Sequence, residues 1–243
     1  MQSIKNSAKS GHNQPLIPYI AYIYGEGMNL TEPKRLRGLD RGERCALLIS
    51  ECQTAVIDPK VAMFKDLANA AQARALPTKI SALAHRCRNA DIPVVHCIVR
   101  LLLGGKTATA NSPIHSIMRK SPFLHRDHPA SGIHPGIEVD PSDIISDRAH
   151  GITAFHDSGL ETALRALNVE TLILTGVSTN IALIGASIEA VNRGFSVVIA
   201  EDCTAGATPE THAHSIEQTL PILGTVCSTG AIMPYIRNQT GVS

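Results

Sequence analysis

The segment from Thr171 to Ala182 reads TLILTGVSTNIA, in which a short apolar run leads into a turn. The apolar run stops at Gly176, and from Asn180 a helical spacing of apolar side chains continues to Arg193. A strand, a tight turn and a helix in immediate succession are typical of an open α/β sheet, which carries its reactive groups at such turns. The segment therefore predicts the fold class and one side of a functional site.

The same alternation of strands and helices extends over most of the chain. Apolar runs predict strands at Cys45–Ser50, Ile92–Ile98, Asp143–Ser146, Thr171–Thr175, Phe195–Ala200 and Thr225–Ser228. Helical spacing predicts helices at Pro77–Arg88, Ser158–Leu167 and Asn180–Arg193, and a further helix that begins at Pro209 with Thr208 as its N-cap. We therefore expect an α/β three-layer sandwich of the Rossmann-like kind, with a mainly parallel six-stranded sheet and helices on both faces.

Two regions depart from this alternation. Residues 1–42 are predicted to form a partly irregular N-terminal arm, and residues 43–243 the functional domain. The arm contains the mostly apolar segment Pro15–Tyr24, which is either a tail or a contact with a neighbouring subunit in a homo-oligomer. The segment Leu101–Asp140 is long and rich in Gly, Pro and His, as are loops that cover a site or an interface.

The amino-acid composition restricts which classes of partner and which cellular compartment we expect. The net charge is +1, and aromatic residues make up 3% of the chain with no Trp, so neither nucleic acid nor an anionic membrane is an expected partner. The six cysteines are scattered and form no CxxC pair, which is typical of reduced thiols in an intracellular protein. The chain has no secretory pattern at its start and no segment of membrane-spanning length. We therefore expect a cytoplasmic protein.

Polar side chains follow two of the predicted strands. Glu51 and Gln53 come directly after the first strand, and Arg148 and His150 follow the third. Because the carboxyl ends of parallel strands meet at one edge of a sheet, these residues are candidates for a common site. Glu51 fits a functional acid and a solvated capping group equally well. Arg148 either holds an anion or forms a structural ion pair, and His150 either transfers protons or caps the turn before Gly151.

Motifs at three strand ends together resemble the isochorismatase-like, or cysteine hydrolase, family. Ala46–Gln53 is similar to the family's opening motif, in which apolar residues precede Asp-x-Gln. Thr153–Phe155 is similar to its Ser-Ala-Phe motif, and Gly176–Thr179 to its nucleophile turn. The likeness covers about residues 44–230. It implies a hydrolase of a small molecule that forms dimers or tetramers.

The resemblance also implies roles for individual residues. Glu51 takes the position of the family's catalytic Asp, and Ala182 takes the position of its nucleophilic Cys. Ala149 falls on the position of the catalytic Lys, with Arg148 and His150 on either side. Since all three catalytic positions differ, we interpret the chain as a naturally divergent member that lacks the nucleophile.

Further residues are expected around the substrate. In the family, a cis peptide bond at the position of Val177–Ser178 directs backbone N–H groups inward as an oxyanion hole. The resemblance thus implies a substrate-binding set made of Gln53, Phe155, Val177, Ser178, Thr179 and Asn180.

Histidines and one cysteine offer other chemistry. The second strand and the long loop carry His96, His115, His125, His128 and His134. Some relatives bind a metal near this strand through Asp-x-His, a spacing that Val95-His96-Cys97 lacks, so we expect no metal and no other cofactor. Cys52 is an alternative nucleophile beside Glu51, but the alternation of side chains along a strand favours a buried structural thiol.

Three hypotheses remain, because an alanine cannot attack a carbonyl carbon as a thiolate does. In the first, Glu51 catalyses hydrolysis of a vinyl ether, or of a related C–O or C–N bond, as an acid and without a covalent intermediate. In the second, the protein is an amidohydrolase whose cysteine has been replaced at Ala182. In the third, it binds a ligand or a partner without turnover. Divergence at three positions argues against a single engineered change, and the retained carboxylate favours the enzyme.

Overall fold

The computed structural model describes residues 36–237, so most of the expected arm, including Pro15–Tyr24, lies outside the described residues. Six strands form one sheet in the order β3-β2-β1-β4-β5-β6, and every neighbouring pair is parallel. The strands are β1 (Cys45–Ser50), β2 (Val94–Val99), β3 (Ile144–Arg148), β4 (Thr171–Val177), β5 (Ser196–Ala205) and β6 (Thr225–Cys227). The prediction of a six-stranded parallel sheet is confirmed.

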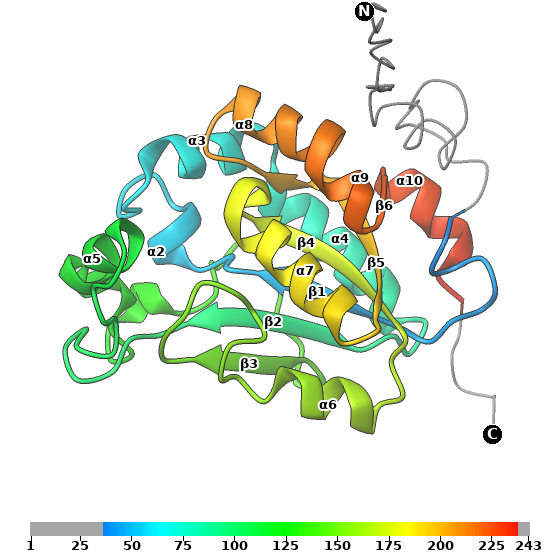
Figure 1. Ribbon diagram of the computed structural model, residues 1–243, viewed down its shortest axis with the longest axis horizontal. Coiled ribbons are helices and arrows are strands. Elements are labelled where there is room, and N and C mark those ends of the chain that lie inside the picture. The colour runs from blue at the N-terminus through cyan, green and yellow to red at the C-terminus, as the bar shows by residue number, and fades with distance from the viewer. Residues whose placement is uncertain (1–35, 238–243) are drawn as a thin grey trace, which may run out of the picture. The chain divides into compact units, whose positions relative to one another are not determined.

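Helices cover both faces of this sheet, with α4 behind it and α6 and α7 in front of it (Figure 1). The α-helices are α2 (Thr54–Ile57), α3 (Lys65–Ala73), α4 (Leu76–Arg88), α5 (Pro113–Lys120), α6 (Leu160–Ala166), α7 (Ile184–Asn192), α8 (Pro209–His214), α9 (Leu220–Leu223) and α10 (Thr229–Ile232). Shorter turns are the 3₁₀ segments η1 (Pro122–Leu124), η2 (Pro129–Ser131) and η5 (Met233–Tyr235), and the π-helical segments η3 (Thr179–Leu183) and η4 (Ser215–Thr219). The predicted three-layer arrangement is therefore confirmed. Within residues 36–237, no helix has the length and apolar character needed to cross a bilayer.

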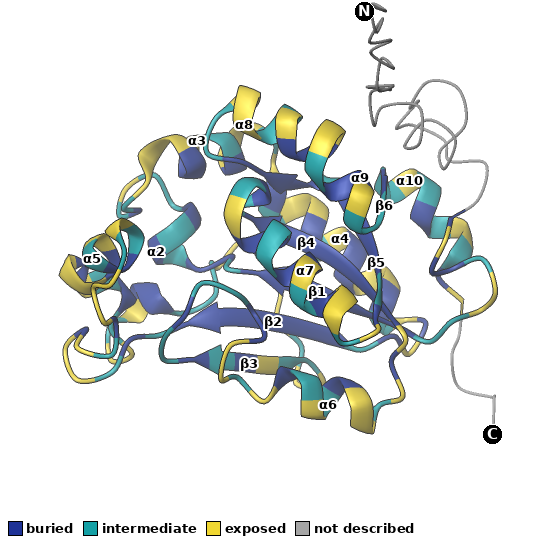
Figure 2. Cartoon of the chain, in the orientation of Figure 1, coloured by how far each residue is buried: buried dark blue, intermediate teal, exposed yellow. Residues whose placement is uncertain are grey.

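The central strands β1, β2 and β4 are mostly apolar because both of their faces are covered. All residues of β1, β2 and β4 are buried, and the strands appear almost wholly dark in Figure 2. On one face, Leu47 and Ile49 of β1 belong to the same core cluster as Ile80 and Leu83 of α4. Each such side chain contributes roughly 1.5–3 kcal/mol when fully buried, so this layer holds the strand ends in fixed positions.

The strand order changes direction between the neighbouring strands β1 and β4. From β1 it proceeds to β2 and β3, and it then returns to β4 and continues to β5 and β6. At the carboxyl ends of this pair, Ser50 lies opposite Gly176, which has a φ of +93°. A Cβ atom on Gly176 would lie 2.1 Å from the backbone oxygen of Ser50, so only glycine fits there. Such a switch point opens a crevice beyond the strand ends, where open α/β sheets bind ligands.

The structure moves some predicted element boundaries. β5 continues to Ala205, beyond its predicted end at Ala200, because the register shifts beside Gly176 and β5 then pairs with the last residues of β4. α8 begins at Pro209 as predicted, and the Thr208 side chain accepts a hydrogen bond from the backbone N–H of Thr211 as its N-cap.

Candidate active site

Glu51 and Arg148 come together at the carboxyl edge of the sheet. Glu51 directly follows β1 and has a left-handed backbone conformation, with a φ of +50°. Arg148 is the last residue of β3, and its Nη2 donates a charge-assisted hydrogen bond to Oε1 of Glu51 and a second bond to the Ile152 oxygen at 3.2 Å. The Arg148 side chain is only 2% exposed and that of Glu51 is 19% exposed. The two strand ends thus supply one ion pair that is largely shielded from water.

This pair borders a cavity of about 190 Å³ in the crevice between β1 and β4. The turn after β4 contributes Ser178, Asn180 and Ala182 to the wall. The rest of the lining is mostly apolar and comes from Val56, Met63, Phe64, Leu67, Val99, Ile114, Met118, Leu124, Gly151, Ile152, Ile181 and Ala207. Since apolar walls screen charges poorly, Glu51 and Arg148 dominate the electrostatics of the cavity.

The turn after β4 places a peptide edge and a helix start against the cavity. The Val177–Ser178 peptide bond is cis, and the helical segment of η3 and α7 begins at Thr179. Ala182 lies in the first turn of this segment and is 4% exposed. The start of a helix favours negative charge because its first backbone N–H groups have no partners within the helix. At this wall a methyl group occupies the position expected for a nucleophile.

Cys52 does not supply the missing thiol. It is 2% exposed, does not line the cavity, and its Sγ donates to the Ser50 oxygen at 3.4 Å. Burial raises the pKa of the Cys52 thiol well above its ordinary value, and the charge of Glu51 raises it further. Both effects disfavour the thiolate, so Cys52 fits the structural role that strand alternation predicts.

Two residues predicted to bind substrate have other partners. The Gln53 amide nitrogen donates to the oxygens of Val99 and Ser131, and its oxygen accepts from the Val99 N–H at 2.9 Å. Gln53 therefore fixes Val99, which lines the cavity, but does not line it itself. Phe155 packs against Phe195, with ring centroids 6.2 Å apart, and is likewise not part of the cavity wall.

The remaining predicted residues lie just behind the wall. The His150 ring stacks on His115 with centroids 4.7 Å apart and also contacts His156, so it faces other histidines and does not line the cavity. Val177 and Thr179 are fully buried on either side of the cavity residue Ser178. Of the predicted set, the cavity thus collects Glu51, Arg148, Ser178, Asn180 and Ala182.

Part of the cavity wall comes from elements that carry no predicted site residue. This part of the wall comes from α3 and α5, through side chains such as Leu67, Ile114 and Met118. Ile114 and Met118 are four residues apart on α5, a helix within the segment that the sequence predicts to be a long loop. The spacing of these apolar residues within a loop rich in Gly, Pro and His is the signal that could have identified them.

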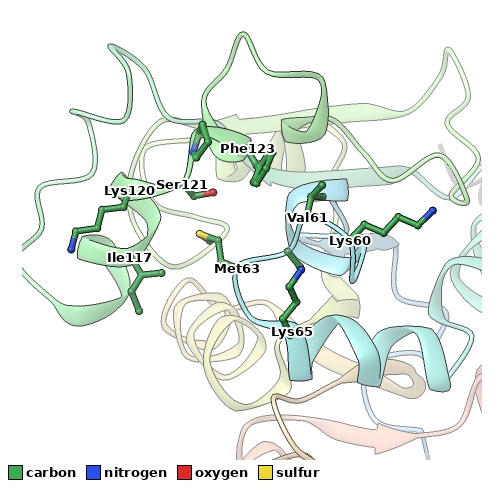
Figure 3. Close-up of a pocket in the computed structure, with 10 residues that line it drawn as sticks. Lys60, Val61, Met63, Lys65, Ile117, Lys120, Ser121 and Phe123 are labelled. Carbon is green, nitrogen blue, oxygen red and sulfur yellow. The ribbon is translucent and has the colours of Figure 1, made fainter.

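A groove of about 380 Å³ shares Met63 with the cavity (Figure 3). It lies between the segments 60–65 and 117–123, which continue into the residues that line the cavity. Lys60, Lys65 and Lys120 belong to its lining, which contains no Asp or Glu, and Lys60 and Lys120 point outward on opposite sides in the view shown. The side chains that line this groove therefore give it a positive charge.

The histidines have partners of their own. His96 binds Asp143 at 2.9 Å, and His115 contacts the Asn111 oxygen at 2.8 Å. Across residues 36–237, no group of three His, Cys, Asp or Glu side chains is arranged to hold a metal ion.

Residues 45–231 match the family model of the isochorismatase domain. The chain belongs to the isochorismatase family. Two curated relatives are described as uncharacterised members of this family. The chain is 38% identical over 80 residues to YecD of Escherichia coli O157:H7 and 34% identical over 58 residues to YaaI of Bacillus subtilis. The matched segments cover 33% and 24% of this chain. They cover 43% of YecD and 32% of YaaI, so this chain matches less than half the length of either relative.

Solved structures of a cysteine hydrolase, an isochorismatase family protein and a pyrazinamidase share this fold. A cysteine hydrolase from Pseudomonas syringae pv. phaseolicola 1448A aligns with 79% of this chain and 92% of its own, at a TM-score of 0.66 and 21% identity. An isochorismatase family protein from Desulfovibrio vulgaris gives a TM-score of 0.67 at 18% identity, over 78% of this chain and 96% of its own. A pyrazinamidase from Pyrococcus horikoshii, solved with zinc, gives 0.60 at 14% identity, over 76% of this chain and 97% of its own.

Proposed function

We propose that this protein hydrolyses a small anionic molecule by proton transfer from Glu51, without a covalent intermediate. The observation that carries the proposal is the Glu51–Arg148 pair in a mostly apolar cavity with Ala182 on its wall. A carboxyl group supplies acid–base chemistry, and a guanidinium and a helix start favour an anion. None of the six cysteines lines the cavity, so nothing there supports attack by a thiolate.

The first step is an exchange of partners at Arg148. Without substrate, the Arg148 guanidinium donates a hydrogen bond directly to Glu51. A carboxylate on the substrate competes for the same guanidinium, which presents several N–H donors in one plane. Glu51, which lines the same cavity, is then free of this partner and available to the substrate as the proton donor.

The chemistry balances for a vinyl ether. Glu51 gives its proton to the terminal carbon of the double bond, and water adds to the adjacent, now cationic carbon. The proton lost by this water returns to the Glu51 carboxylate, and the resulting hemiketal breaks its C–O bond to give a ketone and an alcohol. No bond to the enzyme forms, so the methyl group of Ala182 has no chemical task in this route.

The groove next to the cavity also supports an anionic substrate. Lys60, Lys65 and Lys120 line this groove, which shares Met63 with the cavity. A positive rim raises the local concentration of anions and accelerates their entry, an effect that weakens as ionic strength increases.

A substrate panel tests the proposal. Isochorismate is the vinyl-ether candidate, with pyruvate release followed through lactate dehydrogenase and NADH, while nicotinamide and pyrazinamide are amide candidates followed by ammonia release. We expect turnover of the vinyl ether alone. Ammonia release would support the amidohydrolase hypothesis, and tight binding of isochorismate without turnover would support the non-catalytic one.

Arg148→Met tests the anion-binding role. A hydrogen bond to a charged group contributes about 1.5–3 kcal/mol, so KM should increase about 10- to 100-fold. Arg148→Lys retains the charge and serves if the Met variant does not fold. Arg126→Gln is the matched control, because Arg126 pairs with Asp147 on the surface and does not line the cavity. An unchanged KM in both Arg148 variants would contradict the role.

A further inference from the structure

Four side chains form a connected chain of contacts behind the turn after β4. Arg74, at the end of α3, donates from Nη2 to Oε1 of Glu201 on β5 at 2.5 Å. The same oxygen lies 3.2 Å from Nε2 of His212 on α8, and His212 Nδ1 lies 3.2 Å from Oγ1 of Thr179.

The negative charge of Glu201 determines which ring nitrogen of His212 carries the hydrogen. Hydrogen bonding from His212 and the guanidinium of Arg74 lower the pKa of Glu201 to about 2, against the effect of burial. The ionised carboxylate can only accept, so Nε2 of His212 must carry a hydrogen. A neutral imidazole has one N–H, which leaves Nδ1 as the acceptor for the Thr179 hydroxyl.

The order hydroxyl, imidazole, carboxylate is that of a nucleophilic triad, but burial gives it another role. The Thr179 side chain has no exposed surface and does not line the cavity. A Cβ atom added at Gly206 would lie 2.7 Å from Thr179 Oγ1 and 2.9 Å from His212, so the hydroxyl is enclosed by packed atoms. A substrate cannot reach it.

The chain of contacts instead connects three parts of the cavity wall. Thr179 stands between Ser178 and Asn180, which both line the cavity. The Asn180 side-chain oxygen accepts from the N–H of Ala207, which lines the cavity from the segment between β5 and α8. Arg74 belongs to the end of α3, the helix that contributes Leu67 to the wall.

We propose that His212 is a positioning residue: Glu201 holds its imidazole with the hydrogen on Nε2, and Nδ1 accepts the Thr179 hydroxyl and so orients the turn that faces the substrate. The effect on rate rests on the proposed function. The protonation pattern does not, and it can be measured without any substrate.

Nitrogen-15 NMR of labelled histidine at pH 8.5 tests the pattern directly. His212→Gln assigns the signal by deleting it, and we expect the Nε2–H tautomer in the full chain. Glu201→Met removes the acceptor and should move the population toward the Nδ1–H tautomer, in which the imidazole donates to Thr179. An Nδ1–H form or an even tautomer mixture in the unaltered chain would overturn the proposal.

Kinetics on the substrate found in the panel provide the second readout. Thr179→Val and His212→Gln should lower kcat/KM about 10- to 100-fold through misplacement of the turn, and Thr179→Ser should restore it. His214→Gln, an exposed histidine on the same helix, is the control and should change nothing. The positioning role would be overturned if Thr179→Ser lost as much rate as Thr179→Val. A fluorophosphonate adduct on Thr179 would overturn it as well. Absence of turnover in the unaltered chain would count against the proposed function, while the NMR result would still decide the role of His212.

Discussion

Replacing Glu201 by Gln should destabilise the protein at neutral pH and much less at acid pH. The pKa of this carboxyl lies at about 2 in the folded protein against an ordinary value of 4.5, because His212 and Arg74 stabilise the charged form. A group whose pKa is lowered by folding stabilises the folded state above its unfolded pKa, and that contribution disappears as the pH falls toward the folded pKa. The stabilisation is therefore complete above about pH 5 and is lost between about pH 4.5 and 2.

The same contacts set the size of the contribution that Glu201 makes to the free energy of unfolding. The difference between 4.5 and about 2 corresponds to at most about 3 kcal/mol. The side chains of Glu201 and Arg74 are each 31% exposed, so solvent screening reduces the expected contribution to about 1–2 kcal/mol.

Urea unfolding followed by far-UV circular dichroism at pH 7, 5, 4 and 3 measures this difference. We expect the unaltered chain to exceed Glu201→Gln by about 1–2 kcal/mol at pH 7 and by less than half of that at pH 3. Glu217→Gln, an exposed carboxyl on η4, serves as the control for general charge effects. A gap that stays constant from pH 7 to pH 3, or no gap at pH 7, would refute the reasoning.

Further predictions concern the packing and stability of the protein around the site. Gly176→Ala should cost about 3 kcal/mol or more in urea unfolding, since its Cβ would overlap the Ser50 oxygen, and a cost below 1 kcal/mol would show that the strands separate easily. Asp143→Asn breaks the buried contacts with Arg88 and His96 and should cost about 3–5 kcal/mol, whereas an unchanged midpoint would mean that the ion pair contributes nothing. All six cysteines are buried, so Ellman's reagent should react with none of them in the folded protein at pH 8 and with six after unfolding; rapid reaction of one thiol before unfolding would contradict this packing.

The fold could be predicted from the sequence because parallel strands covered on both faces are mostly apolar, as β1 and β4 are. Strand ends were harder to place. β3 was expected at Asp143–Ser146 but spans Ile144–Arg148, because the Asp143 side chain binds Arg88 and His96 while the backbone continues to pair with β2 through Arg148.

Only part of the site could be predicted from the sequence. Glu51, Arg148 and the turn at Ala182 could be grouped because strand topology brings their strand ends to one edge of the sheet. The partners of Gln53 could not be foreseen, since its amide binds backbone atoms 46 and 78 residues away. The contact of Thr179 with His212 likewise spans 33 residues and depends on how α8 packs, which no local pattern encodes.

The rate of Glu51→Gln against the unaltered chain tests the central claim most directly. Gln keeps the shape of the side chain but cannot donate the carboxyl proton, so kcat for the substrate found in the panel should fall about 10²–10⁴-fold. Intact-mass spectrometry of the unaltered enzyme, quenched during turnover, should show the mass of the free chain only. A Glu51→Gln enzyme within threefold of the original rate, or a substrate-derived mass added to the quenched chain, would contradict proton transfer by Glu51 without a covalent intermediate.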